Sequence, residues 1–345
     1  MVFTRLLGSL GVGGPTVDTV LAPGPVLPGG TLSGEVRVEG GRAEARIEGI
    51  TLELVARVEA ETEDGEHEGG VVFERYLVGG GLRIAEGERE TVPFSLVLPW
   101  ETPLTELYGQ PLGIVLGVRT EVAVAGGRDK GDLDPLTVGA LPAQEAVLEA
   151  FGRLGFGFRC ADLELGRIGG TGQQLPFYQE IELTPPPRYA HAVNEIEVTF
   201  LASPGGMDVV LEADKRGGLF SEGHDTLTRF TVSHEQAGQL DWTSEVDGWV
   251  SRLVEHRAVY GDHASYGHGD PYGGQHSGHE GHGGHGGHRS GPGVGAAVAA
   301  GAAGLAVGVA GGLVAAEIVD EVGDFFEDED EDENENEDEG GGDED

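Results

Sequence analysis

Cysteine, basic residues and aromatic residues are all scarce in this 345-residue sequence. A single cysteine, Cys160, excludes an intrachain disulfide and is typical of a reducing compartment, where we expect a buried small side chain rather than a reactive thiol. Only 21 Lys and Arg accompany 61 Asp and Glu, which gives a formal net charge of -40. Such a field repels nucleic acids and anionic lipid headgroups, so DNA binding is excluded as the primary role.

Signatures of the common catalytic sites are also missing from the sequence. It contains no Gly-x-Ser-x-Gly elbow, no His-Glu-x-x-His, no Walker loop and no Gly-x-Gly-x-x-Gly after an expected strand. The pair Asp132 and Asp134 could hold a divalent cation through its oxygens, but beside Pro135 we expect it to serve turn chemistry. We therefore predict that the protein is not an enzyme and requires no cofactor.

The first residues do not form a convincing secretory signal, because glycines interrupt the apolar stretch after Arg5. One face of a short helix instead collects Val2, Phe3, Leu6, Leu7 and Leu10. We expect this helix to pack on the folded body of the same chain, a β-sandwich by the patterns described next. Membrane contact is the alternative. The predicted location is cytoplasmic, with attachment at the membrane periphery left open.

Alternation of apolar and polar residues with a period of two is the main pattern of the first half. Apolar side chains from Ile50 to Val58 alternate with mostly polar ones, as in a strand with one buried face. Similar strands are expected at 71–78, 90–98 and 114–124, and Gly-rich turns separate them. Several short strands with turns between them indicate a β-sandwich.

The second half combines strands with two helices. Apolar residues recur at helical spacing over 143–154, after Pro142, so we place the domain junction near Leu141. A closing helix is expected at 244–256, where Val246, Trp249, Val250 and Leu253 share one side. The expected strands lie at 156–165, 177–183, 195–201, 207–213 and 226–232.

The order of these features resembles that of the SpoOM sporulation-control family, whose members have an arrestin-like fold. An apolar, Gly-punctuated lead segment precedes a Thr-Val-Asp-Thr strand, and five further segments follow in the family's order. They are residues 29–36 (GGTLSGEV), 46–54 (RIEGITLEL), 130–136 (KGDLDPL), 175–180 (LPFYQE) and 217–220 (GGLF). The resemblance covers roughly residues 1–255 and implies a part in the control of sporulation or development.

The resulting prediction is a mainly β protein with two arrestin-like β-sandwich domains, the second with flanking helices, and a low-complexity C-terminal extension. The expected segments are an N-terminal sandwich at 1–140, a β-rich domain with helices at 141–258, a His/Gly-rich linker at 259–292, an Ala/Gly/Val helix candidate at 293–326 and an acidic disordered tail at 327–345. The tail is self-repelling and has no apolar residue to bury.

The linker carries the strongest chemical pattern of the sequence. Five histidines recur at every third position after two earlier ones: His263, His268, His276, His279, His282, His285 and His288. In an extended polyproline-II conformation, with three residues per turn, the five would line one side. Neutral imidazole binds zinc, copper and nickel, so we predict weak binding of Zn, Ni or Cu. A neutral, soluble linker is the alternative.

Residues 293–316 carry no charge and place a small residue at every fourth position. Such a stripe, which includes Gly304, Gly308 and Gly312, permits close helix approach, so self-association or membrane association through 293–326 is predicted. The alternatives are a disordered linker and docking on the sandwich.

From these patterns and from what the resemblance to the SpoOM family implies, we predict a non-enzymatic regulatory scaffold that binds protein partners and no nucleic acid. Two other classes stay open: a metal-handling protein that uses the histidines, and an envelope-associated scaffold anchored through 293–326. The sequence does not name the partner.

Overall fold

The computed structural model describes residues 13–62, 65–213, 228–263 and 317–318. Its strands are β1 (Thr16–Leu21), β2 (Thr31–Glu39), β3 (Ala45–Thr62), β4 (Gly65–Gly79), β5 (Leu82–Ile84), β6 (Arg89–Val97), β7 (Glu106–Leu107), β8 (Gln110–Pro111), β9 (Leu116–Val124), β10 (Lys130–Pro135), β11 (Gly157–Leu165), β12 (Phe177–Thr184), β13 (Ile196–Ser203), β14 (Gly206–Ala213), β15 (Thr228–Ser233) and β16 (Glu317–Ile318). The helices are α1 (Pro142–Arg153), the 3-10 helix η1 (His234–Gln236) and α2 (Trp242–His263).

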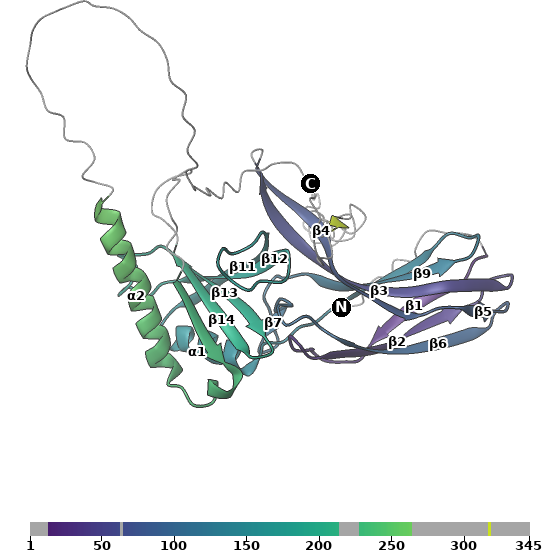
Figure 1. Cartoon of the computed structure of the whole chain (residues 1–345), viewed down its shortest axis with the longest axis horizontal. Helices are drawn as coiled ribbons and strands as arrows, with labels where there is room; N and C mark the ends of the chain where they lie inside the picture. Colours follow the sequence, from purple (N-terminus) through teal and green to yellow (C-terminus); the bar gives the residue numbers. More distant parts are fainter. Residues whose placement is uncertain (1–12, 63–64, 214–227, 264–316, 319–345) are drawn as a thin grey trace, which may run out of the picture.

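The first half is a two-layer sandwich. One layer is the antiparallel sheet β1-β2-β6, and the other is built from β10, β9, β3, β4 and β5 (Figure 1). Alternate residues of each strand point between the layers, as the period-two pattern predicts. The core contains Leu32, Val36, Val38, Ile50, Leu52, Leu54, Val118 and Val122, each at most 3% exposed.

The second half is an antiparallel sheet with helices on one face. Strands β11 to β15 follow one another in chain order, and α1 and α2 cover the same side of them (Figure 1). Apolar residues of the helices and of the inner sheet face form a separate core: Val147, Phe151, Ile181, Val198, Val209, Leu211, Val246, Trp249, Val250 and Leu253. The sheet's other face carries no helix among the described elements.

Local capping explains where the two helices begin. Pro142 occupies the first turn of α1, where its missing N–H costs nothing, and the Gln144 side chain accepts a hydrogen bond from the Leu141 N–H at 2.8 Å. At α2, the Asp241 carboxylate accepts from the backbone N–H of Ser244 at 3.3 Å and from its hydroxyl at 2.8 Å. These hydrogen bonds lower the pKa of Asp241.

The mainly β fold class with two helices is confirmed. The two predicted helices correspond to α1 and α2. No helix in the described part of the chain is long and apolar enough to span a membrane. The predicted N-terminal helix lies outside the described residues, as does most of the extension beyond His263. Within the helix candidate 293–326 only Glu317 and Ile318 are described, and they are extended rather than helical because they pair with β4.

Candidate functional site on the outer face of the second sheet

The segment Leu175–Glu180, which carries the Leu-Pro-Phe motif, joins the two halves of the molecule. Leu175 and Phe177 are buried in the first core although they precede and begin β12, and the Phe177 ring meets Phe73 edge-on at 5.5 Å. The Gln179 amide donates to the Leu104 carbonyl and accepts from the Leu104 N–H, both at 2.9 Å. A parallel pairing of Glu164 with Glu59 adds β11 to β3 beside this contact.

Replacing Gln179 with Ala tests this joint. We expect the free energy of unfolding to fall by about 1–2 kcal/mol, because the half-buried backbone N–H and carbonyl of Leu104 lose their partner. Chemical denaturation monitored by circular dichroism measures the change. Exposed Gln110→Ala in β8 is the control and should lie within about 0.5 kcal/mol of the parent protein; equal stability of both variants would contradict a joining role for Gln179.

Because side chains alternate along a strand, every second residue of β12 lies on the outer face of the sheet, away from the helices. Tyr178, Glu180 and Glu182 point outward, while Phe177, Ile181 and Leu183 are buried inward. The register aligns Glu182 with Glu197 of β13, and Glu197 with Glu212 of β14. Glutamates of three neighbouring strands therefore meet on one face, an arrangement that Coulomb repulsion disfavours.

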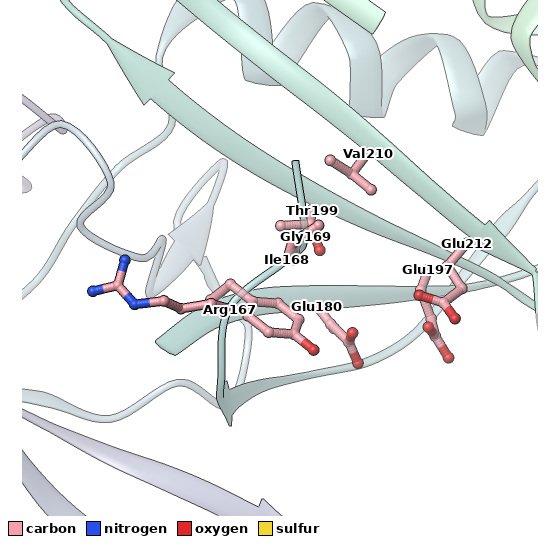
Figure 2. A pocket seen from close by; sticks show the side chains of 9 residues that line it. Arg167, Ile168, Gly169, Glu180, Glu197, Thr199, Val210 and Glu212 are labelled. Atoms are coloured by element: carbon pink, nitrogen blue, oxygen red, sulfur yellow. The ribbon is translucent and has the colours of Figure 1, made fainter. Parts of the chain in front are cut away.

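The glutamates Glu180, Glu197 and Glu212 line a pocket of about 250 Å³. One carboxylate oxygen of each lies within 4.8 Å of the other two. Figure 2 shows their side chains extending to the same side of the strands. The remaining lining comes from Thr199 and Val210 on the sheet and from the loop after β11, with Tyr178 at the side: Arg167, Ile168, Gly169 and Tyr178.

Burial and the crowding of carboxylates in this pocket favour the protonated form of Glu180. Burial, followed by the charges of Glu197, Asp162, Glu212 and Glu164, raises its pKa to about 9. At neutral pH the Glu180 carboxyl is thus mainly neutral, which spares the pocket one negative charge. The same burial and acidic neighbours raise the pKa of Tyr178 well above its usual range.

Arg167, the one arginine in the lining of this pocket, is engaged elsewhere. Its guanidinium donates to the backbone carbonyls of Gln173 and Gln174 at 2.9 and 3.3 Å. In Figure 2 it points away from the three glutamates. It therefore shapes the loop, and the three glutamates give the pocket an acidic lining.

The acidic character extends across the face toward β11. Asp162 and Glu164 come within reach of Glu180, and Arg159 binds both Glu182, at 2.7 Å, and Glu195. Cys160 is half-buried beside Glu182, and burial followed by this carboxylate raises its pKa to about 11. The Cys160 thiol is therefore protonated at neutral pH and a poor nucleophile, although it is less buried than expected.

Two kinds of cation fit such a pocket. Carboxylate oxygens are the ligands of Ca²⁺ and Mg²⁺, and each of the three glutamates offers one oxygen. A Lys ammonium or an Arg guanidinium can instead form charge-assisted hydrogen bonds with the same oxygens. Among the described elements no helix covers this sheet face, which favours entry of a side chain of another protein.

The structure leaves most predicted site residues untested. His263 is the last residue of α2, and His268, His276, His279, His282, His285 and His288 lie outside the described residues. The self-association residues Gly304, Gly308 and Gly312 also lie outside them.

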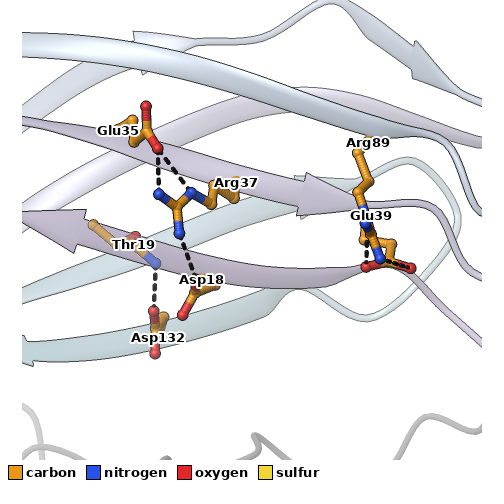
Figure 3. A network of polar contacts seen from close by, with 7 residues as sticks. All are labelled: Asp18, Thr19, Glu35, Arg37, Glu39, Arg89 and Asp132. Carbon is orange, nitrogen blue, oxygen red and sulfur yellow. Dashed lines mark hydrogen bonds and ion pairs between the residues drawn. The ribbon is translucent and has the colours of Figure 1, made fainter.

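Asp132 and Asp134 lie in strand β10 rather than in a turn. The Asp132 carboxylate accepts a hydrogen bond from the backbone N–H of Thr19 at 2.7 Å and so links β10 to β1 across the two sandwich layers (Figure 3). On the neighbouring surface, Arg37 binds Glu35 and Asp18, and Arg89 binds Glu39. Asp132 thus has a structural role at the sandwich edge.

Sequence reasoning missed the acidic pocket, although its signal was present. Glutamates occupy outward positions of three consecutive strands at Glu180, Glu197 and Glu212. Isolated glutamates on strands are usually solvated. Only the register shows that these side chains converge.

The architecture defines a class of mainly β proteins in which a β-sandwich is joined to a second sheet that is covered by helices on one face and acidic on the other. Comparisons with known proteins identify the family. A model of the SpoOM protein family matches residues 3–217. The chain is 35% identical over 261 residues to the sporulation-control protein spo0M of Bacillus subtilis (strain 168), covering 74% of this chain and 98% of that protein. The crystal structure of Spo0M from Bacillus subtilis superposes with a TM-score of 0.62 at 30% identity, covering 71% of this chain and all of that one. The chain belongs to the SpoOM family.

Proposed function

We propose that this protein is a non-enzymatic regulator in the control of sporulation, which acts by binding other proteins. Membership of the SpoOM family and likeness to a sporulation-control protein support the regulatory role. The binding surface is the outer face of the second sheet, and its pocket receives a Lys or Arg side chain of a partner.

One observation carries the proposed surface: in a pocket of about 250 Å³, one carboxylate oxygen of each of Glu180, Glu197 and Glu212 lies within 4.8 Å of the other two. Arg167 lines the pocket but binds backbone carbonyls. The pKa of Glu180 is raised by burial and by four neighbouring carboxylates, an unfavourable arrangement that a bound cationic group would relieve. Local arrangements that lower the stability of the fold are commonly found at functional sites.

A photo-crosslinking residue at Gly169 tests the surface in cells that produce the full chain. Gly169 is exposed at the pocket rim and has open space around a side chain added there. Gly152 on α1 is exposed and equally open, and it serves as the control position. We expect a protein to be captured from Gly169 and absent from Gly152.

The captured protein is then purified and its affinity measured against a charge-neutral triple variant, Glu180→Gln, Glu197→Gln and Glu212→Gln. Loss of the charge pairs should weaken binding by at least about tenfold and reduce its dependence on salt. The control variant removes the same formal charge at exposed positions of the first half, by Glu44→Gln, Glu86→Gln and Glu90→Gln. Equal affinity of both variants would refute the pocket as the binding surface, and binding to Ca²⁺ or Mg²⁺ alone would assign the pocket to a metal.

A further inference from the structure

The outer edge of β4 is occupied by a segment from the far end of the chain. β4 pairs along one edge with β3, from Ile50–Gly79 to Thr62–Gly65. On its other edge, Val72 pairs with Glu317 and Val71 with Ile318, in antiparallel register. Figure 1 shows β16, in yellow, beside β4.

We propose that the edge of β4 at Val71–Val72 is a strand-acceptor surface, and that the chain's own segment Glu317–Ile318 binds there within the same molecule. An edge strand presents backbone N–H and carbonyl groups that any extended segment of suitable register can satisfy. Among the described strands, β4 pairs only with β3 and β16, so no other element competes for this position. The surface fits an extended peptide added as a further strand.

The local structure of β4 favours addition at this point. A register shift between Leu54 and Val55 of β3 leaves Phe73 without a cross-strand partner, directly beside the two pairing residues. Such a bulge bends a strand and increases its twist, which limits how far a neighbouring strand can continue. Gly69 and Gly70 precede Val71 on the other side, so no side chain flanks the pairing residues there.

The chain between α2 and β16 is long enough for β16 to pair with β4 of the same molecule. The 53 residues between His263 and Glu317 have a contour length of roughly 175 Å, at about 3.3 Å per residue. This exceeds the dimensions of a folded unit of this size. The pairing also fixes the start of the acidic run to the first half, so that Glu317 becomes an attachment point of the C-terminal extension.

Cysteine crosslinking of the full chain tests the register. Because Cys160 is the only cysteine, a Cys160→Ser background removes all native thiols. Val72→Cys with Glu317→Cys should form an intramolecular disulfide at least about tenfold faster than Leu77→Cys with Glu317→Cys, because only the first pair is within the ~4.4–6.8 Å Cα separation that a disulfide spans. Leu77 is 76% exposed on the same strand and controls for reactivity. Equal rates for the two pairs, or crosslinks only between molecules, would overturn the proposal.

Hydrogen exchange provides a second measurement without engineered thiols. Glu317→Pro with Ile318→Pro removes the N–H groups of β16, and protection of the β4 amides at Val71–Phe73 should fall. Gly341→Pro with Gly342→Pro, placed near the end of the chain, should leave it unchanged. If the double proline variant at Glu317 and Ile318 left exchange of the β4 amides unchanged, β16 would not pair with this edge.

Discussion

Phe177→Ala should lower the free energy of unfolding by about 3–5 kcal/mol, among the largest effects of a single substitution in this protein. Phe177 is 1% exposed and packs edge-on against Phe73 of β4, so truncation leaves a cavity inside the first core. The surroundings cannot collapse into it, because Pro176 and the Gln179 contacts to Leu104 fix the chain on both sides. For a protein of this size, the thermal midpoint should fall by about 8–15 °C.

The effect should reach both halves of the molecule. Phe177 begins β12 of the second sheet but packs in the first core. Trp242 and Trp249 lie in the second core, so in a Trp100→Phe background tryptophan fluorescence reports on that half, while circular dichroism reports on all strands. Both signals should move together to the lower midpoint. A shift in one signal alone would mean that the halves unfold independently.

Phe158→Ala is the matched control for this experiment. Phe158 is on the neighbouring strand β11 but is 52% exposed. Its replacement should change stability by no more than about 0.5 kcal/mol. Comparable losses for Phe158→Ala and Phe177→Ala would contradict the role assigned to the junction.

The fold was largely predictable because its signals are local. Alternation from Ile50 to Val58 identifies β3 and its buried face, and helical spacing after Pro142 identifies α1. The prediction that Asp132 and Asp134 serve turn chemistry was wrong. Both aspartates lie in strand β10, which pairs antiparallel with β9. Asp132 also binds the backbone of Thr19, 113 residues earlier in the chain, a contact that no local pattern encodes.

The same limit applies to the candidate site. Sequence alternation correctly indicates that Glu180, Glu197 and Glu212 face away from the core. It does not specify that β12, β13 and β14 are neighbours. Nor does it specify that their register pairs Glu197 with Glu212 and that the carboxylate oxygens of both come within 4.8 Å of one of Glu180. Likewise, the Leu-Pro-Phe motif marks a strand entry, but the insertion of Phe177 into the first core depends on how β11 docks on β3. The histidine and glycine residues that dominate the sequence patterns stay predictions.

On strand β12, the residue that contacts the first half is directly followed by a residue that lines the pocket. Gln179 binds Leu104 of the first half, and the next residue, Glu180, lines the pocket. Occupation of the pocket can therefore be transmitted to the contact between the halves through one peptide unit. For this reason a change in the charge of Glu180 should be visible in the stability of the whole described fold.

Glu180→Gln should stabilise the protein at alkaline pH and leave it nearly unchanged in acid. The pKa of Glu180 rises from 4.5 to about 9 on folding, through burial and then through repulsion by Glu197 and other carboxylates. A carboxyl with a raised folded pKa contributes its full stability below the unfolded pKa and loses it as pH increases toward the folded pKa. The parent protein therefore loses stability between about pH 4.5 and pH 9, whereas a neutral amide of the same shape does not.

At pH 8.5 we expect Glu180→Gln to raise the free energy of unfolding by about 2 kcal/mol, which corresponds to roughly 4–8 °C in the thermal midpoint. At pH 4.5 the two proteins should unfold within about 1 °C of each other, because the parent carboxyl is protonated in the folded state. Glu90→Gln, an exposed change of the same charge, corrects for the general repulsion within an acidic chain and should show no comparable pH dependence. Differential scanning calorimetry across this range measures all three. If Glu180→Gln were destabilising at pH 8.5, the Glu180 carboxylate would have to be ionised and paired with a cation in the folded protein, and the electrostatic description of the pocket would be wrong.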